Sequence, residues 1–384
     1  MHHDSDLGDL RRSAAAFARQ SYASTAQGWD DGSSEFDAGE RRRLGELGYL
    51  GIALPTEHGG GGGTLLEALV VLEELAKVSQ TAAWPVFEAN VGAARVIQIY
   101  GSDDQRRRHL PAIVAGSATM AVAISEPEAG SAATDMALRA TVEDDQVVLR
   151  GQKRWCSGAG HAEQYLTYCR FGDAPGAKGI GAVVVGKDAP GLSFGRRERL
   201  MGFRGIHSAD MYFDDVRVPI DDLVVGAGGF SRLFTAFTIE RMGNATMSLA
   251  IAQRCLDDSV AYSQERHQFG KPICEFQMVQ AALADMITKT EGARLLVERA
   301  AVGAGTGAPD SLQASTAKYA ANLAAKEVAD LALQLHGGYG YSPELGIEGR
   351  LRDAHGWAIA GGTVNMQRLR IVSEYLGRRF DQRR

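Results

Sequence analysis

The spacing of the apolar residues changes twice along this chain of 384 residues, and that pattern limits the possible folds more than any other feature. Up to about residue 117 the apolar residues recur at three- and four-residue intervals, as on one face of a helix. From residue 119 to about residue 225 the interval shortens to two, which is typical of strands separated by Gly, Asp and Pro turns. After residue 230 the helical interval returns. We therefore expect an α+β fold in the order helical, β, helical.

Each zone contains candidate elements. Helices are expected over residues 40–47, 64–78, 90–100, 242–268, 276–302, 311–336 and 365–380. Strands are expected over residues 147–149, 164–168, 181–185 and 209–213. The zones predict an N-terminal α-helical domain (1–118), a central β-domain (119–225) and a C-terminal α-helical domain (226–384). The length and the hydrophobic share of 45% support two or three packed units with a core.

Charge, cysteines and apolar runs argue against several classes of protein. A formal net charge of −6 is unlike that of a general nucleic-acid binder. The short Arg runs are expected to lie on solvated faces, and the alternative is that they lie near a phosphate-bearing ligand. Four cysteines without a Cys-x-x-Cys pair indicate free thiols in a reducing compartment. The polar start of the chain predicts no secretory segment, and no apolar run has the length of a membrane span. We expect a cytoplasmic protein with no nucleic-acid binding and no membrane insertion.

Two glycine-rich stretches, residues 59–63 and 303–307, are expected to be plain loops. The first is followed by Thr-Leu-Leu, where a phosphate-binding P-loop needs Lys and then Ser or Thr. The second follows a helical pattern and not a strand, so it lacks the context of a dinucleotide-binding fold.

Two segments of the β zone could face a cofactor. Residues 123–131 begin as a strand and break into a loop of small residues, whose N–H groups and the hydroxyls of Ser125 and Ser131 suit a planar heterocycle. A tight turn with capping serines is the alternative. Residues 151–160 place Trp155 and Ser157 two apart on a strand, and so on one side of it. They could flank a cofactor ring, although a half-buried Trp in a β-core gives the same pattern.

A third segment places Glu240 between an apolar run and an expected helix start, next to Arg241. The helix N-terminus and Arg241 favour the carboxylate, whereas apolar burial raises its pKa, so Glu240 is a candidate general base. A Glu–Arg pair at a helix start can also be purely structural. Residues 266–277 follow it, and a fourth segment covers residues 334–341 and 361–365.

In order and spacing, these four segments resemble the acyl-CoA dehydrogenase family over nearly the whole chain. The resemblance implies an N-terminal helical domain, a central β-barrel-like domain and a C-terminal four-helix bundle, assembled as a homotetramer with FAD as the cofactor. Many members carry the catalytic Glu where this chain has Gly361, whereas the isovaleryl-CoA and long-chain enzymes carry it where this chain has Glu240. The chain resembles the second group, and Gly361 would leave space for the relocated carboxylate.

The same resemblance implies roles for individual residues. Those implied to contact the flavin half of FAD are Ile124, Ser125, Gly130, Ser131, Trp155, Ser157, Thr363 and Asn365. Those implied to contact the adenosine-diphosphate half of FAD bound to a neighbouring subunit are Arg266, Phe269, Gln334 and Gly338, and Gln277 is also implied to bind the cofactor. Those implied to face the substrate are Glu88, Ser131, Phe237, Arg241, Gly361 and Gly362.

The reaction that the resemblance implies is α,β-dehydrogenation of an acyl-CoA or acyl-carrier-protein thioester to the trans-2-enoyl thioester. Glu240 would remove the α-proton while the β-hydrogen leaves as hydride to flavin N5, and an electron-transfer flavoprotein would reoxidise the flavin. A flavin-dependent oxidase or monooxygenase on the same scaffold is the alternative, but those enzymes lack a Glu in either catalytic place.

The identity of the substrate stays open. Glu88 falls at the closed end of the family's acyl pocket, where an acid would disfavour long chains, and a surface Glu is the alternative interpretation. Thr238 stands where many members have an Asp, so the pantetheine contacts and the choice between coenzyme A and a carrier protein are not determined.

Overall fold

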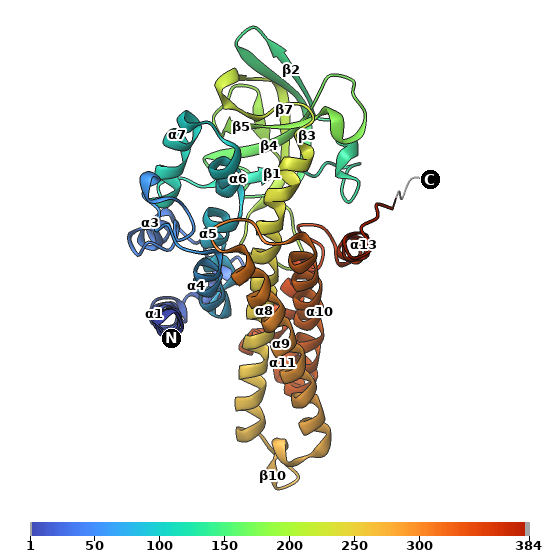
Figure 1. Ribbon diagram of the computed structural model, residues 1–384. Coiled ribbons are helices and arrows are strands. Elements are labelled where there is room, and N and C mark those ends of the chain that lie inside the picture. Colours follow the sequence, from blue (N-terminus) through green and yellow to red (C-terminus); the bar gives the residue numbers. More distant parts are fainter. Residues whose placement is uncertain (1, 381–384) are drawn as a thin grey trace.

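The sheet and the long helices occupy different ends of the molecule. In the computed structural model, which describes residues 2–380, the sheet lies at one end and three long helices extend away from it to the other (Figure 1). The N-terminal helices lie beside the junction between these two parts (Figure 1). The order of elements confirms the predicted α+β fold.

Several of the helices that precede the sheet begin at a side-chain cap. They are α1 (His2–Tyr22), α2 (Ala26–Asp30), α3 (Ala38–Glu46), α4 (Leu65–Val78), α5 (Gln80–Val91), α6 (Ala93–Tyr100) and α7 (Asp103–Val114). Thr64 and Glu67 form a capping box that begins α4, because each side chain accepts a hydrogen bond from the other's backbone N–H. The single helix predicted over residues 90–100 is wrong, since Gly92 separates α5 from α6.

The sheet buries side chains on both faces. Its strands are β1 (Met120–Ala123), β2 (Arg139–Glu143), β3 (Gln146–Ser157), β4 (Gln164–Phe171), β5 (Ile180–Gly186), β6 (Leu192–Phe194), β7 (Ser208–Pro219) and β8 (Leu223–Val225). They follow the order β6-β7-β3-β2-β4-β5-β8, and β1 pairs in parallel with β4. Along β4, Leu166 and Tyr168 face the core shared with the helices, whereas Tyr165 and Cys169 face a second core formed within the β region.

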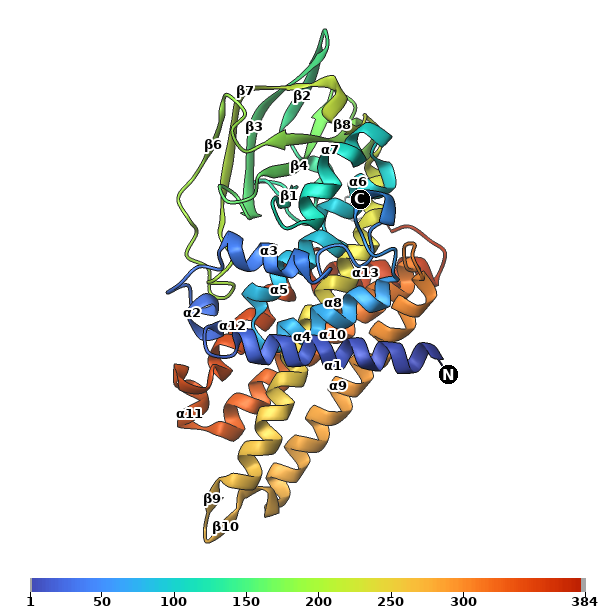
Figure 2. The ribbon, with the colours of Figure 1, turned by 90° about the vertical axis from the view of Figure 1, so that its left-hand side faces the viewer.

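One helix, α8 (Phe230–Glu265), connects the sheet to the far tip of the molecule (Figure 2). The predicted start at Met242 is wrong, because no Gly or Pro interrupts the preceding turns, and the hydroxyls of Thr235 and Thr238 donate to carbonyls within the helix. Phe230, Phe234 and Phe237 instead follow a helical spacing, and their rings contact one another in sequence. The 36 residues of α8 therefore include the candidate base in the helix interior.

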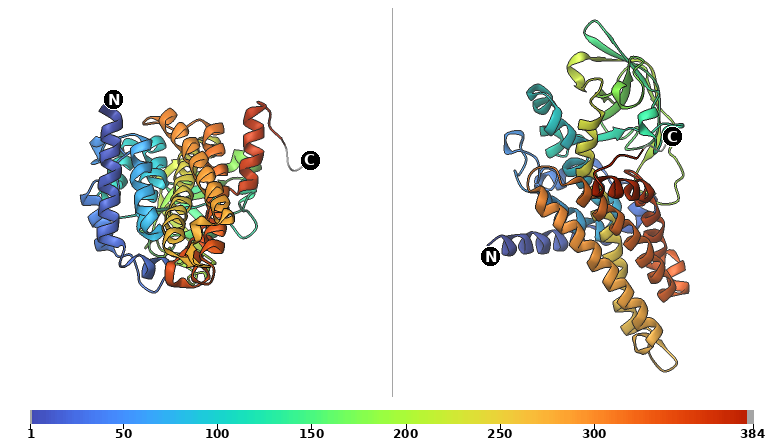
Figure 3. Two further views of the ribbon diagram at one scale, coloured as in Figure 1. Left: turned by 90° about the horizontal axis from the view of Figure 1, so that it is seen from below. Right: turned by 45° about the vertical axis from the view of Figure 1, so that its right-hand side comes forward.

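The rest of the C-terminal region packs around α8. Its elements are β9 (His267–Gln268), β10 (Lys271–Pro272), α9 (Gln277–Ala304), α10 (Ser311–His336), α11 (Gly338–Tyr341), α12 (Ile347–Trp357) and α13 (Val364–Tyr375). The N-terminal helices lie on one side of α8, α9 and α10, and α13 lies on the other (Figure 3). α13 ends before the predicted residue 380 because Gly377, with a φ of +59°, closes it.

Short 3₁₀ turns connect several of these elements. They are η1 (Thr56–His58), η2 (Ala133–Asp135), η3 (Gly176–Gly179), η4 (Ile220–Asp222), η5 (Ile273–Glu275) and η6 (Pro343–Leu345). Within residues 2–380 no helix has the length and apolar character needed to cross a membrane. The side chains of residues 6–380 form no group of three or more His, Cys, Asp or Glu that could hold a metal ion.

Candidate active site

Glu240 and Gly361 lie far apart in the sequence but meet inside the protein. Glu240 is on α8, and Gly361 is in the turn between α12 and α13. A Cβ atom on Gly361 would lie 2.6 Å from Oε1 and 2.7 Å from Oε2 of Glu240. The φ of Gly361 is +62°, which favours glycine. The Glu240 carboxyl group therefore occupies the space that a side chain at position 361 would fill.

The surroundings of Glu240 act on its pKa in opposite directions. The residue is partly enclosed, but its Oε2 atom is buried and has no hydrogen-bond partner within the described chain. Burial raises the pKa of Glu240, while the charges of Lys318 and Arg241 lower it. The expected contribution of a helix N-terminus is wrong, because Glu240 lies well inside α8 and that effect is confined to the first turn.

Two arginines lie against one aromatic ring next to Glu240. The guanidinium groups of Arg241 and Arg370 are 5.2 Å and 5.3 Å from the ring centre of Phe234, and Phe237 stacks on Phe234 at 5.6 Å. Nε and Nη1 of Arg241 are buried and have no hydrogen-bond partner in the part of the chain described. Burial, followed by repulsion from Arg370, lowers the pKa of Arg241 to about 10. The cluster thus holds buried positive charge with unused hydrogen-bond donors.

Lys318 lies beneath the turn that contains Gly361. Its ammonium group is fully buried on α10 and donates to the backbone carbonyls of Trp357 at 3.4 Å, Ala360 at 2.9 Å and Gly362 at 3.1 Å. Burial lowers the pKa of Lys318 to about 8. The turn between α12 and α13 therefore directs backbone carbonyl groups at a buried cation.

Two buried asparagines complete this network. Asn322 accepts from Lys318 at 3.1 Å and donates to Asn244 at 2.9 Å and to Ser248 at 2.7 Å. Asn244 donates to the carbonyls of Trp357 and Ala360, both at 3.2 Å. Because Asn244 lies one helical turn after Glu240 on α8, the network fixes the turn relative to the helix that carries the carboxyl group.

A buried ion pair holds the loop after β1 against β3. Lys153 donates to Glu126 and to the carbonyl of Ile124, both at 2.8 Å. The backbone N–H of the next residue donates to the carbonyl of Ser125 at 2.9 Å. The two other residues of this loop that were predicted to contact the flavin, Gly130 and Ser131, are exposed.

Trp155 projects from β3 with its indole 51% exposed. It belongs to neither hydrophobic core, so the alternative of a core Trp is wrong. The pairing of β3 with β7 shifts between Lys153 and Cys156, and Trp155 has a φ of +62°. Simple alternation therefore does not set the relative direction of Trp155 and Ser157, because Trp155 itself lies in a bulge. The Arg154 guanidinium covers part of the indole at 4.3 Å.

Thr363 and Asn365 follow directly on the turn at Glu240. Thr363 begins α13, and its hydroxyl oxygen accepts from the backbone N–H of Met366 at 3.2 Å. Asn365 is exposed and accepts from Arg368 at 2.6 Å. The start of α13 therefore lies close to the candidate base, as the sequence motif suggests.

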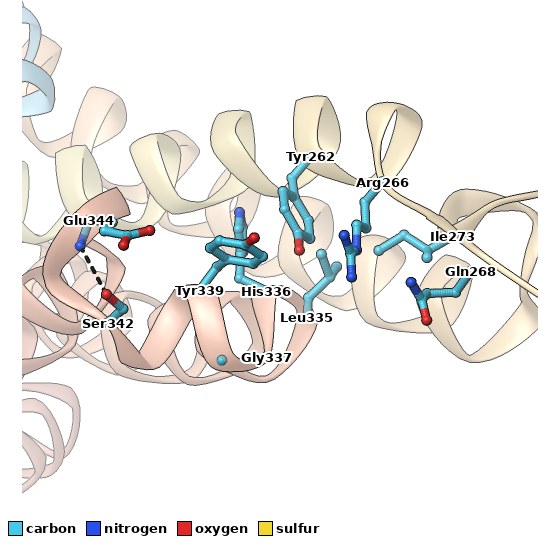
Figure 4. Close-up of a pocket in the computed structure, with 11 residues that line it drawn as sticks. Tyr262, Arg266, Gln268, Ile273, Leu335, His336, Gly337, Tyr339, Ser342 and Glu344 are labelled. Carbon is cyan, nitrogen blue, oxygen red and sulfur yellow. Dashed lines mark hydrogen bonds between the residues drawn. The ribbon is translucent and has the colours of Figure 1, made fainter.

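A cavity of about 560 Å³ lies at the C-terminal end of α8 (Figure 4). Arg266 lines it from the α8 side, and Gly338 and Tyr339 line it from α11. Three other residues that the resemblance implies to bind FAD are exposed and do not line the cavity. They are Phe269, Gln277 and Gln334. Glu240, in the interior of α8, and Arg266, directly after its last residue, thus mark two separate sites.

Glu88 is buried in α5 with 8% exposure, so the surface interpretation is wrong. A Cβ atom on Gly158 would lie 3.7 Å from its Oε1, which places the carboxyl group at the turn between β3 and β4. Burial raises the pKa of Glu88 to about 8, against a smaller lowering by a hydrogen bond with Trp84. At neutral pH Glu88 is therefore mainly an uncharged carboxylic acid.

Sequence reasoning missed the residues that hold the site in place. They are Glu126, Lys153, Asn244, Lys318 and Asn322. The sequence does indicate that Lys318 is unusual. It falls on the alanine-rich face of the predicted helix over residues 311–336, where a buried charge needs a partner. Its partners are main-chain carbonyls from a distant turn, which no side-chain pattern could reveal.

Three family models together match most of the chain. The acyl-CoA dehydrogenase N-terminal domain matches residues 5–117, the acyl-CoA dehydrogenase middle domain matches residues 121–216, and the acyl-CoA dehydrogenase C-terminal domain matches residues 227–376.

Individual relatives are similar over nearly their full length. The 3-sulfinopropanoyl-CoA desulfinase of Paraburkholderia xenovorans (strain LB400) is 38% identical over 380 residues, which cover 98% of this chain and 97% of the relative. The caffeyl-CoA reductase-Etf complex subunit CarC of Acetobacterium woodii is 32% identical, with 94% and 96% covered. The structure of butyryl-CoA dehydrogenase from Megasphaera elsdenii is 31% identical with a TM-score of 0.92, and 96% of this chain and 98% of that one are covered.

Proposed function

Because the chain belongs to the acyl-CoA dehydrogenase family, we propose that it removes hydrogen from the α- and β-carbons of an acyl-CoA thioester, with Glu240 as the base for the α-proton. The protein is a flavoenzyme of the acyl-CoA dehydrogenase type, and its cofactor is FAD. The observation that carries the proposal is the contact between the Glu240 carboxyl group and Gly361. The space at Gly361 is taken by a carboxyl group from a different helix, so the turn does not need an acidic side chain of its own.

The electrostatics of Glu240 suit a base. Burial holds its pKa above that of an exposed carboxyl group, so the carboxylate gains proton affinity, while Lys318 and Arg241 limit the rise. A base in position typically contributes roughly 100- to 10,000-fold to the rate. Arg241, with two unpaired buried donors, lies beside Glu240 and would bind polar groups of the thioester.

The described residues fit FAD. Trp155 presents an exposed indole on β3, next to a loop that carries the hydroxyls of Ser125 and Ser131, and both suit a flat ring system. The cavity at Arg266 combines a cation with the backbone of Gly337 and Gly338, which suits a pyrophosphate. Bound FAD supplies the acceptor for the hydride that leaves the β-carbon.

We also propose a homotetramer, in which the cavity at Arg266 would serve a neighbouring subunit's cofactor. Large apolar side chains are exposed along α9 and α13, including Met278, Leu295, Val302, Val372 and Tyr375. Exposed apolar side chains in such numbers are typical of an interface between subunits. An electron-transfer flavoprotein is proposed as the redox partner, since one relative is a subunit of a reductase-Etf complex.

The test is anaerobic bleaching of the flavin by a panel of acyl-CoA and acyl-carrier-protein thioesters. Glu240→Gln keeps the size of the side chain but removes the basic oxygen, so it is expected to bind FAD and slow bleaching by about 100- to 10,000-fold. Glu46→Gln, on the exposed end of α3, is the matched control and should bleach normally. Near-normal bleaching by Glu240→Gln would remove Glu240 as the base. Peroxide formation in air would identify an oxidase instead.

A second candidate function is hydrolytic cleavage of the bond between the β-carbon of an acyl-CoA and a sulfinate sulfur, in which water supplies a proton to the β-carbon and an oxygen to the sulfur, which leaves as sulfite. It is favoured by the 38% identity to a 3-sulfinopropanoyl-CoA desulfinase over 98% of the chain, and by the unpaired buried donors of Arg241, which could bind an anion. Sulfite release from 3-sulfinopropanoyl-CoA, without flavin bleaching, would favour this function over dehydrogenation.

A further inference from the structure

We infer that Lys318 is a positioning residue for the proposed base: it holds the turn between α12 and α13 against Glu240 and keeps a positive charge behind that turn. The inference rests on the proposed function, because it concerns the same carboxyl group. It begins from the position of Lys318, whose side chain is entirely buried on α10.

A buried ammonium group is unfavourable unless its charge is balanced. Among residues 6–380, whose side chains the structure describes, no carboxylate lies within ion-pair distance of Lys318. Its hydrogen bonds go to neutral groups, three main-chain carbonyls and the amide oxygen of Asn322. The negative group that interacts with it through space is Glu240, and that interaction favours the ammonium form. The two charges therefore stabilise each other across the turn.

The turn lies between the cation and the carboxyl group. Ala360 and Gly362 direct their carbonyls to Lys318, and Gly361 between them faces Glu240. Displacement of the ammonium group would remove one hydrogen bond from each of the two carbonyls that flank Gly361, which would leave Asn244 as the donor to Ala360 and Gln367 as the donor to Gly362. Lys318 thus controls both the place of the turn and the charge felt by Glu240.

The charged and titratable groups that face Glu240 come from three elements. Lys318 on α10 and Arg241 on α8 are cations, and Tyr168 on β4 is a buried phenol whose pKa Glu240 helps to raise. Arg241 is also directed at Phe234, where Arg370 of α13 opposes it. Lys318 is the cation behind the turn, so its removal should leave the cluster at Phe234 in place.

Asn244 provides a matched comparison. It donates to two of the carbonyls that Lys318 binds, those of Trp357 and Ala360, but it carries no charge. Asn244→Leu therefore loosens the same turn and keeps the cation, whereas Lys318→Met removes hydrogen bonds and charge together.

The experiment measures the rate of anaerobic flavin reduction by the best acyl-CoA as a function of pH, in the holoenzyme and in both variants. The rate rises with pH as the base loses its proton, and removal of a nearby cation raises the pH at which this happens. Lys318→Met is expected to move the rise upward by about one pH unit or more. Asn244→Leu should lower the rate without moving the rise, and Lys318→Arg, which restores a cation, should return it toward the wild-type position.

A second readout does not depend on turnover. Infrared difference spectra between low and high pH contain a band of the protonated Glu240 carboxyl group, assigned by its absence in Glu240→Gln. The midpoint of that band should rise in Lys318→Met. An unchanged midpoint in Lys318→Met, or an equal shift in Asn244→Leu, would show that Lys318 is only structural.

The proposed function and this inference fail in different ways. If Glu240→Gln still reduces the flavin normally, the proposed base is wrong whatever Lys318→Met does. If Glu240→Gln is inactive and Lys318→Met leaves the pH rise in place, only the inference is wrong. If Lys318→Met does not fold, Lys318→Gln replaces it, and failure of both to accumulate as holoenzyme would also overturn the inference.

Discussion

Replacement of Glu88 by Gln should stabilise the protein increasingly as the pH rises. The wild-type carboxyl group is buried in α5, and burial raises its pKa from 4.5 to about 8. A raised pKa means that the folded state holds this proton more tightly than the unfolded state. The associated stability is fully present below about pH 4.5 and is lost as the pH rises toward 8. Glutamine does not titrate, so Glu88→Gln is free of this loss.

The magnitude follows from the distance between the two pKa values. Each pH unit between them changes the free energy of unfolding by about 1.4 kcal/mol. From about pH 5 to about pH 7, Glu88 should therefore lower the stability of the wild type by about 2 to 3 kcal/mol relative to Glu88→Gln. The value applies to one side chain with 8% exposure, so solvent screening reduces it little.

The assay is urea unfolding of wild type and Glu88→Gln at matched protein and FAD concentrations across this pH range. The difference in free energy of unfolding between the two proteins should grow with pH. Glu46→Gln, with an exposed carboxyl group, is the control and should run parallel to the wild type. Parallel curves for wild type and Glu88→Gln would mean that Glu88 is ionised and solvated in the folded protein, and the reasoning would be refuted.

Three further predictions concern the site. Gly361→Ala places a Cβ atom 2.6 Å from the Glu240 carboxyl group, so single-turnover flavin reduction should fall by about 100-fold, whereas Gly48→Ala, with a φ of +75° and open space around it, should not affect the rate. Arg266→Ala should lower the ratio of flavin to protein absorbance without unfolding the chain, and full occupancy would remove Arg266 from the cofactor site. The double variant Glu240→Gly with Gly361→Glu should recover part of the bleaching lost in Glu240→Gly, and no recovery would show that the two positions do not reach the same α-carbon.

The sequence predicted elements best where both ends carry a local signal. α10 matches the predicted residues 311–336 because Asp310 caps its start and Gly337 ends it. The start of α8 could not be predicted in the same way, since the aromatic turn before Met242 contains no boundary residue. That error placed Glu240 at a helix end and added a helix N-terminus to the influences on its pKa, whereas the predicted influences of burial and of Arg241 are confirmed.

The site was predictable to the extent that its residues are chemically distinctive. The resemblance to the family paired Glu240 with Gly361, and the structure brings them close together, since a Cβ atom on Gly361 would lie 2.6 Å from Oε1 of Glu240. Lys318 was not found, because its role depends on carbonyl groups whose direction only the folded turn defines. The burial of Glu88 was equally hidden, since an acid inside a helix gives the same spacing whether it faces solvent or a neighbouring strand turn.

The continuity of α8 has a consequence for how the length of this chain can vary. Glu240 and Arg266 are separated by a regular helix, which sets them about 39 Å apart along its axis. One residue inserted between them would rotate Arg266 by about 100° around that axis relative to Glu240. In a symmetric assembly the insertion would displace Arg266 in the same way in every subunit, so no subunit could provide a correctly placed Arg266 to its neighbour. Insertions should therefore be tolerated in the hairpin of β9 and β10, beyond Arg266, and not between Glu240 and Arg266.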